Sequence, residues 1–123
     1  MKATLNEITV NGTVYVPKDT VTSFAQPVDG LQEVMIRSAN SGVHFGFLEE
    51  RDGDEVRLIN SRRVFYWSGA ASLSQLATEG SSKPNDCKIA VTVPEITVFG
   101  VCEIIPLTET ASKNLNAIKQ WKA

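Results

Sequence analysis

The stretch that decides the fold is RRVFYWSGAASLSQLA, residues 62–77. Its first half carries three consecutive aromatic residues, and with the period of two that is typical of a β-strand Val64 and Tyr66 share one face and Phe65 and Trp67 the other. After Gly69 the spacing changes, and Leu73 and Leu76 lie three residues apart, as they would on one face of a helix. The change predicts a strand that turns at a glycine into a short helix, with two arginines on the strand side.

The helix start in this stretch is a candidate recognition site. We predict a two-turn helix over residues 70–78 that stops at Gly80, since glycine is common just after a helix. If Ser68 or Gly69 lies at its entrance, unpaired backbone N–H groups favour an anion, which an arginine could clamp. An aromatic ring could stack on a base or pack against a partner protein. The predicted ligand-binding residues are Arg62, Arg63, Tyr66, Trp67, Ser68, Gly69 and Ser72.

A plainer interpretation of the same residues stays open. Alternating aromatics in a strand more often belong to a core, and exposed arginines often only keep a surface solvated. No glycine-rich phosphate loop of the Walker or dinucleotide-binding type accompanies the stretch. The narrower expectation is that Arg62, Arg63 and the backbone of residues 68–70 are the part that is free to recognise something.

Strand-like segments dominate the chain from residue 32 onward. The first four form an antiparallel meander with a tight bend near residues 60–61. The predicted strands span residues 33–38, 43–50, 55–60, 62–67, 88–93, 96–101 and 102–105, with breaks at Pro94 and Gly100. Thr108 or Thr110 should cap a short helix that runs to about residue 118. We therefore predict a mainly β fold, an antiparallel sandwich or partly open barrel with an N-terminal β-hairpin and one or two short helices. One face of the sheet should build the core.

The sequence predicts a separate N-terminal hairpin and arm over residues 1–31. Residues 32–123 are predicted to form the β-rich body with a C-terminal tail. Two β-branched runs flank Asn11-Gly12, a strong two-residue hairpin signal, and a polar segment follows to Leu31. A single hairpin is too small to be stable alone, so the arm should pack on the body or exchange with another chain. The predicted interface residues are Tyr15, Phe24 and Trp121, because tryptophan near a free terminus docks readily on a neighbour or on its own domain.

Composition limits the class of protein. The chain has 123 residues, enough for one domain with a core and too few for two ordinary domains. A formal net charge of −2 argues against extended nucleic-acid binding, which needs many lysines and arginines. No apolar run reaches the length of a membrane span, and the N-terminus lacks the pattern of a signal peptide. We expect a protein that stays in the cytoplasm and makes no membrane contact.

Residues for catalysis or metal binding are few. His44 is the only histidine, which excludes a two-histidine metal site, and we expect it at the surface or rim of the sheet, opposite Val43 and Phe45. Cys87 and Cys102 are expected to be buried thiols without a disulfide. We predict no catalytic residue, no metal site and no cofactor.

One acidic segment, residues 49–55, packs five carboxylates around a turn. Oxygen-rich turns can hold calcium or magnesium, although this spacing does not match an EF-hand loop. The favoured interpretation is a solvated hairpin tip, with Arg51 and Arg57 balancing part of the negative charge.

Three segments resemble one known group of proteins. They are ANSGVHFG at residues 39–46, SRRVFYW at 61–67 with GAASLSQLA at 69–77, and EIIP at 103–106. In this spacing they resemble small, functionally uncharacterised proteins encoded by tailed bacteriophages, over roughly residues 34–121. The resemblance implies a viral origin and brings no established catalytic residues. It places the protein in the cytoplasm of an infected bacterium, with the virion as the alternative.

Two functional hypotheses follow. The first is a non-enzymatic phage interaction protein, an accessory or assembly component that acts through protein contacts in a homo-oligomer and with a host or phage protein. The second is a counter-defence protein that binds and sequesters a phosphorylated small molecule, such as a nucleotide signal, through Arg62, Arg63 and the helix start.

Overall fold

The computed structural model describes residues 23–123, together with the backbone of residues 8–10 and 13–15 near the N-terminus. In chain order the elements are β1 (Ile8–Val10), β2 (Thr13–Tyr15), β3 (Glu33–Ser38), β4 (Gly42–Asp52), β5 (Glu55–Tyr66), α1 (Leu73–Glu79), η2 (Pro84–Asp86), β6 (Lys88–Val98), β7 (Val101–Pro106) and α2 (Glu109–Asn116). The two strands of the predicted N-terminal hairpin are confirmed and pair antiparallel. Its Asn11-Gly12 turn and arm residues 16–22 lie outside the described residues.

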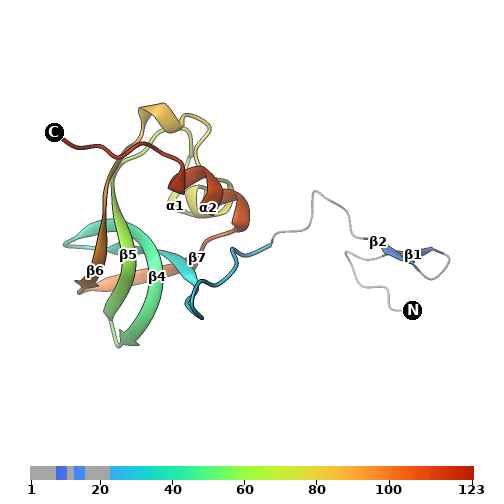
Figure 1. Cartoon of the computed structure of the whole chain (residues 1–123), viewed down its shortest axis with the longest axis horizontal. Coiled ribbons are helices and arrows are strands. Elements are labelled where there is room, and N and C mark those ends of the chain that lie inside the picture. The colour runs from blue at the N-terminus through green and yellow to red at the C-terminus, as the bar shows by residue number, and fades with distance from the viewer. Residues whose placement is uncertain (1–7, 11–12, 16–22) are drawn as a thin grey trace.

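The body is one five-stranded antiparallel sheet in the order β6-β5-β4-β3-β7. The edge strands β6 and β7 are consecutive in sequence, and only Phe99 and Gly100 join them. Such a short connection brings the two edges together at one end, so the sheet is strongly bent (Figure 1). Ser38 Oγ donates to the carbonyl of Phe99 at 2.7 Å and holds this corner. The prediction of a mainly β, antiparallel fold with short helices is confirmed, in the form of one open sheet.

The predicted bend at residues 60–61 is wrong, because β5 runs without interruption through them. Asn60 has a positive φ of 50°, and the pairing of β4 with β5 shifts register opposite it. On β4, a Cβ at Gly46 would lie 2.9 Å from Cα of Ser61. A glycine that admits close backbone approach and an asparagine that tolerates positive φ together produce a bulge in a continuous strand.

The predicted break at Pro94 is also wrong, and β6 continues through it. Proline lacks the backbone N–H that a central strand must donate, but an edge strand has one side without a strand partner. The predicted break at Gly100 is confirmed: β6 ends at Val98 and β7 begins at Val101, and Gly100 between them adopts a φ of +70°. Two of the predicted strands therefore merge into β6, and the last becomes β7.

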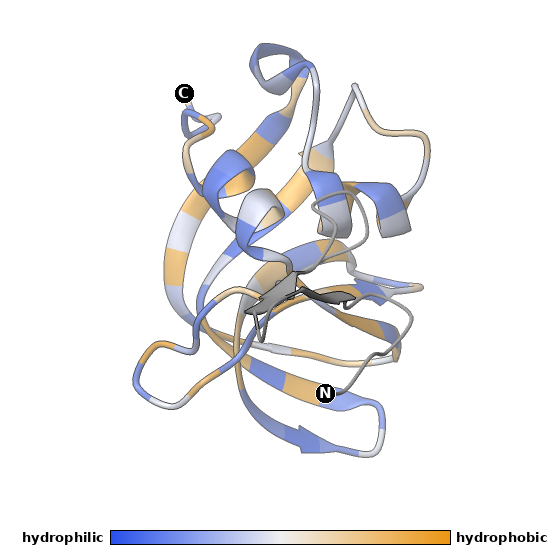
Figure 2. Ribbon diagram, turned by 90° about the vertical axis from the view of Figure 1, so that its right-hand side faces the viewer, coloured by the Kyte–Doolittle hydropathy of each residue, from blue (hydrophilic) through white to orange (hydrophobic). Residues whose placement is uncertain are grey.

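Both faces of the sheet are buried, so the expectation of a core on one face is wrong. The first core lies between the sheet and the two helices, which lie side by side in Figure 1. The second core fills the other face, inside the bend. Figure 2 shows the resulting alternation of hydrophobic and hydrophilic residues along the strands. The second core consists of Val34, Ile36, Val56, Leu58 and Val98, flanked by Leu48, Ile96, Val101 and Ile104.

Both predicted helices are present. The first begins at a later residue than predicted. Ser72 caps α1 by accepting from the backbone N–H of Gln75 at 3.1 Å, while Gln75 Oε1 accepts from the N–H of Ala71 at 2.7 Å. The Ser72 cap starts the helix later than the predicted residue 70. Gly80 ends α1 and Thr108 caps α2, as predicted. Among the described residues, no helix combines the length and apolarity needed to cross a membrane.

Candidate functional site

The two arginines of the quoted stretch lie on opposite faces of β5. Arg62 is 4% exposed and belongs to the face that the helices cover. Its Nε donates to the carbonyl of Ala90 at 2.9 Å, Nη2 to the carbonyl of Ile89 at 3.2 Å and Nη1 to the carbonyl of Leu115 at 3.2 Å. Burial lowers the pKa of the Arg62 guanidinium. Arg62 therefore joins β5, β6 and the end of α2, and its nitrogens are occupied inside the protein.

The neighbouring elements explain why Arg62 finds these partners. The pairing of β5 with β6 shifts register between Arg62 and Val64, which takes carbonyls of β6 out of the regular ladder. The third acceptor belongs to the last turn of α2, where the helix dipole favours a cation. The Phe45 ring lies beneath the guanidinium, 6.0 Å from its central carbon. The carbonyls of Ile89 and Leu115 also accept from the backbone N–H groups of Trp121 and Ile118, so Arg62 gives each of them a second donor.

Arg63 is exposed on the opposite face and contacts His44. Its Nε donates to Nε2 of His44 at 3.1 Å, and the two residues are direct partners in the β4–β5 register. His44 is 1% exposed, so the expected surface position is wrong. The face of the sheet that carries His44 is also buried, because the sheet bends around the second core. Burial first, and the charge of Arg63 second, lower the pKa of His44 from 6.5 to about 4.

A cleft of about 210 Å³ opens on this second face, between β4, β5 and β6. Within the described part of the chain, Nδ1 of His44 and Oγ of Ser61 are buried and have no hydrogen-bond partner. Ser61 is 1% exposed and precedes Arg63 by two residues, so the two share a face. The lining residues are His44, Ser61, Arg63, Ala90, Val91, Val93 and Ile96. Sequence reasoning missed His44 and Ser61 here, although strand alternation from Arg63 points to Ser61.

The aromatic residues of the stretch also separate. Trp67 packs against the first core and donates from Nε1 to the carbonyl of Ala70 at 3.3 Å. Tyr66 is exposed. Phe65, which the predicted site omitted, is 62% exposed and stacks on Trp121, with ring centroids 4.8 Å apart. Alternation also signals this position, since it places Phe65 on the face of Arg63.

The C-terminal tail reaches this aromatic pair by pairing with β6. The backbone N–H of Trp121 donates to the carbonyl of Ile89 at 2.8 Å, and Gln120 forms a parallel bridge with the same residue. Nζ of Lys88 lies 5.4 Å from the centre of the Trp121 ring. We call Phe65, Tyr66, Lys88 and Trp121 the aromatic face.

At the predicted anion site, the backbone N–H groups of Ala71 and Gln75 donate within the chain, to Oε1 of Gln75 and Oγ of Ser72 respectively. Ser68 and Gly69 precede the helix, and their carbonyls accept from the hydroxyls of Ser81 and Ser82 respectively. Gly69 has a φ of 82°, and a Cβ there would lie 2.5 Å from the backbone nitrogen of Lys83. Ser72 is the helix cap. These three residues hold the 81–83 loop and begin α1, away from the Arg63 cleft.

The remaining predicted site residues have mixed surroundings. Phe24 is exposed, and its backbone forms a bridge with Thr108. The side chain of Tyr15 lies outside the described residues.

Cys87 is buried as predicted, whereas Cys102 is exposed because it lies on the edge strand β7; neither forms a disulfide. The acidic hairpin tip is exposed as predicted, with Arg57 pairing Glu49 and Glu50. No group of metal-binding side chains occurs among the described residues.

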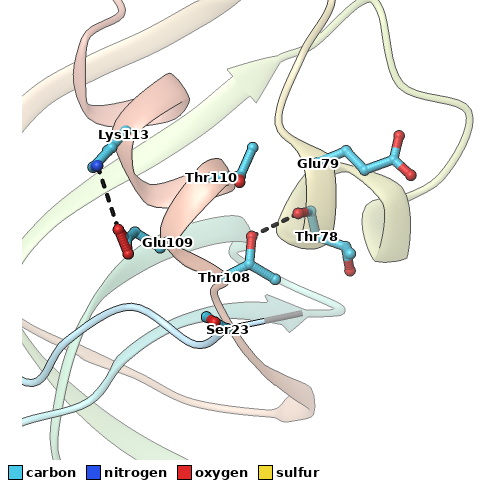
Figure 3. Close-up of a pocket in the computed structure, with 7 residues that line it drawn as sticks. All are labelled: Ser23, Thr78, Glu79, Thr108, Glu109, Thr110 and Lys113. Carbon is cyan, nitrogen blue, oxygen red and sulfur yellow. Dashed lines mark hydrogen bonds and ion pairs between the residues drawn. The ribbon is translucent and has the colours of Figure 1, made fainter. Parts of the chain in front are cut away.

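A larger polar pocket of about 400 Å³ lies where α1 and α2 meet (Figure 3). Its principal groups already bond to one another. The hydroxyl of Thr108 donates to the carbonyl of Thr78 at 2.6 Å, and Lys113 pairs with Glu109 at 3.3 Å. The second acid, Glu79, makes the pocket unfavourable for an anion. This pocket joins the helices and lacks the unpartnered groups of the cleft on the second face.

Comparison with known proteins gives a family. Nothing matches this chain among curated proteins or among solved structures. A family model described as "Domain of unknown function (DUF6948)" matches residues 31–115, more than half of the chain. The matched region contains all five strands of the main sheet and both cores except Ile118. This chain therefore belongs to the DUF6948 family of domains of unknown function.

Proposed function

We propose that this protein is a non-enzymatic interaction protein of a bacteriophage, an accessory or assembly component that acts by binding a second copy of itself. The observation that carries the proposal is the aromatic face. Trp121, at 46% exposed, and Phe65 present a stacked pair to solvent, and the exposed Tyr66 pairs in the β5–β6 register with Lys88, which contacts Trp121. Exposed aromatic clusters mark protein contact surfaces, and tryptophan and tyrosine supply much of the binding energy there. The resemblance to small phage proteins supports the viral assignment.

The type of contact also follows from the strands. Edge strands can associate through their free backbone groups, and proline on an edge opposes this. Pro94 lies in β6, and the tail covers the same edge at Ile89. Side-chain contact across the aromatic face is therefore favoured over continuation of the sheet along β6. The predicted interface residue Trp121 belongs to this surface, whereas Phe24 lies on another segment.

Light scattering and native mass spectrometry of the full chain would test the proposal. We expect an oligomer for the wild type and a shift to monomer for the double variant Phe65→Ser with Trp121→Ser. Phe99→Ser is the matched control, because Phe99 is also 62% exposed and lies in the β6–β7 turn. A wild-type protein that is monomeric at micromolar concentration would overturn self-association, as would an oligomer that survives the double variant.

The alternative is a counter-defence protein that sequesters a phosphorylated small molecule, and it has less support. It requires Arg62, Arg63 and the start of α1 to act together. Arg62 is bonded within the first core, Arg63 lies on the other face, and α1 is a seven-residue helix capped by its own serine. Of the residues that this alternative requires, Arg63 lines a cleft, together with His44 and Ser61, which the predicted site did not include.

A further inference from the structure

The cleft on the second face is an apolar hollow beside the aromatic face. Its lining residues His44 and Ser61 are each 1% exposed, so they lie beneath its surface. The rest of the lining is Arg63 and four aliphatic residues of β6, which are Ala90, Val91, Val93 and Ile96. A hollow of this kind favours an apolar occupant, because the contact removes aliphatic surface from water.

The cleft and the aromatic face are continuous with each other. On β5, Arg63 of the cleft and Phe65 of the aromatic face are two residues apart and share one side of the strand. On β6, Ala90 of the cleft follows Ile89, whose carbonyl accepts from the backbone N–H of Trp121. The ring stack and the hollow therefore belong to one surface.

This surface can pair with a copy of itself. In a dimer with two-fold symmetry, each copy must offer both halves of every contact, since residue i meets residue j and j meets i. An exposed ring stack and a cleft at adjacent positions satisfy this condition, because each can face the other across the axis. The cleft has a volume of about 210 Å³. A cavity of about 150 Å³ holds a benzene ring, so one ring of the stack fits.

The charges on this surface favour the same arrangement. Arg63 and Lys88 are exposed cations, and no carboxylate occurs among the residues of the cleft or of the aromatic face. Neither cation forms an ion pair within the described part of the chain. Arg63 donates to His44 through Nε, which leaves its terminal nitrogens available to a partner. A guanidinium is attracted to the face of an aromatic ring within about 6 Å, so a ring in the cleft complements Arg63.

We propose that two copies of the chain associate by reciprocal insertion, in which one ring of the Phe65–Trp121 stack enters the cleft of the other copy. The ring packs against Val91 and Val93 of β6 and lies beneath Arg63. Each dimer then contains two identical contacts. This inference rests on the proposed function and adds the receiving surface, which the predicted interface residues did not include.

Sedimentation of the full chain would test the receiving surface. Val91→Glu places a charge at the cleft, beside Arg63, and Val91 is 38% exposed, so the variant should fold. We expect its self-association to weaken by about a hundredfold or more, because the inserted ring would bury that charge. Arg63→Gln should weaken association by roughly twofold to thirtyfold.

Thr92→Glu is the matched control for Val91→Glu. Thr92 is the next residue on β6 and is also exposed, but it pairs with Arg62 and so belongs to the other face of the sheet. The same charge at this position should leave self-association unchanged.

A mixture of two variants tests the reciprocity of the contact. Val91→Glu copies keep the ring stack, whereas copies with Phe65→Ser and Trp121→Ser keep the cleft. Each variant alone should be monomeric, with folding checked by circular dichroism. When unlabelled Val91→Glu is added to the isotope-labelled double variant at up to millimolar concentration, we expect saturable resonance shifts at Val91 and Val93 of the labelled copy. One contact of the two remains, so this complex should be weaker than the wild-type dimer.

Two results would overturn reciprocal insertion and leave the proposed function intact. They are a Val91→Glu variant that associates as strongly as the wild type, and a mixture of the folded variants without shifts at the cleft. In either case the rings would meet the partner elsewhere. A monomeric wild type would contradict the proposed function itself, and reciprocal insertion with it.

Discussion

Arg62 and Arg63 are adjacent in sequence and have opposite surroundings. Arg62 is enclosed by the first core, and all three of its donor contacts go to backbone carbonyls. Arg63 lines a cleft on the second face and donates from Nε to the neutral ring of His44. The side-chain period of two in a strand separates them. The difference shows that one face of this sheet is closed by helices, whereas the other holds polar groups that lack partners.

The largest expected effect is the loss of Arg62. Arg62→Met keeps much of the volume but removes the three charge-assisted hydrogen bonds that join β5 to β6 and to the end of α2. We expect the free energy of unfolding to fall by about 3–5 kcal/mol. Urea unfolding followed by tryptophan fluorescence measures it. The matched control Arg63→Met should change stability by less than ~1 kcal/mol. Equal losses for the two variants would contradict the contrast between the faces.

The next effect concerns pH and His44. A buried neutral histidine binds its proton less readily in the folded state, with a pKa of about 4 against 6.5 for an ordinary histidine. The unfolded chain therefore takes up the proton first, and stability falls as the pH drops from 6.5 towards 4. At ~1.4 kcal/mol per pH unit, the contribution of this group amounts to a loss of roughly 3 kcal/mol.

The single histidine makes this titration simple to follow by proton resonance. The His44 signal should titrate near pH 4 in the folded protein and near 6.5 in urea. Arg63→Gln should raise the folded pKa in part, because burial remains and only the charge is removed. A folded pKa close to 6.5 would contradict the burial of this ring.

A smaller loss is expected from Gly46→Ala, which tests the close approach of β4 and β5 beside the cleft. The new Cβ would lie 2.9 Å from Cα of Ser61, a backbone atom that cannot move without shifting the strand. We expect the free energy of unfolding to fall by about 1–3 kcal/mol. Thermal unfolding measures this change. A variant as stable as the wild type would show that the bulge does not depend on the glycine.

The smallest effect should have the opposite sign. Ser61→Ala removes a buried hydroxyl that has no partner, so we expect stability to rise by up to ~1 kcal/mol. Ser72→Ala is the matched control, because its hydroxyl caps α1 and its loss should cost about 1 kcal/mol. Thermal unfolding of both variants gives the comparison. A loss in Ser61→Ala equal to that in Ser72→Ala would mean that Ser61 has a partner in solution.

Local signals predicted much of the fold. The hydrophobic pattern located β3 without error, Gly80 marked the end of α1, and Thr108 was one of the two residues predicted to cap α2. The signals failed where one strand depends on its neighbour. Asn60 and Pro94 look like strand breakers, but Asn60 fits a bulge opposite Gly46, and Pro94 lies on an edge. Neither circumstance can be read from the residue alone.

The candidate site was harder to predict than the fold. Proximity in sequence grouped Arg62, Arg63 and Ser68, yet the structure brings Arg63 together with His44 from the preceding strand. The tail contact of Trp121 with Phe65 joins residues far apart in the chain. Both groupings depend on strand register, which a pattern of side chains in one segment does not specify.

By itself, the sequence determined the strand content, the change from strand to helix after Gly69, and the Gly80 and Thr108 caps, because these depend on neighbouring residues. It did not separate Arg62 from Arg63, which the prediction grouped in one site. Only the tertiary structure decided which face of the sheet the two helices cover. The short connection between β6 and β7 bends the sheet, buries His44 on the second face, and leaves Arg62 to donate to carbonyls of β6 and α2 on the first. Long-range strand pairing, which no local pattern encodes, decided that Arg62 is buried and Arg63 is exposed.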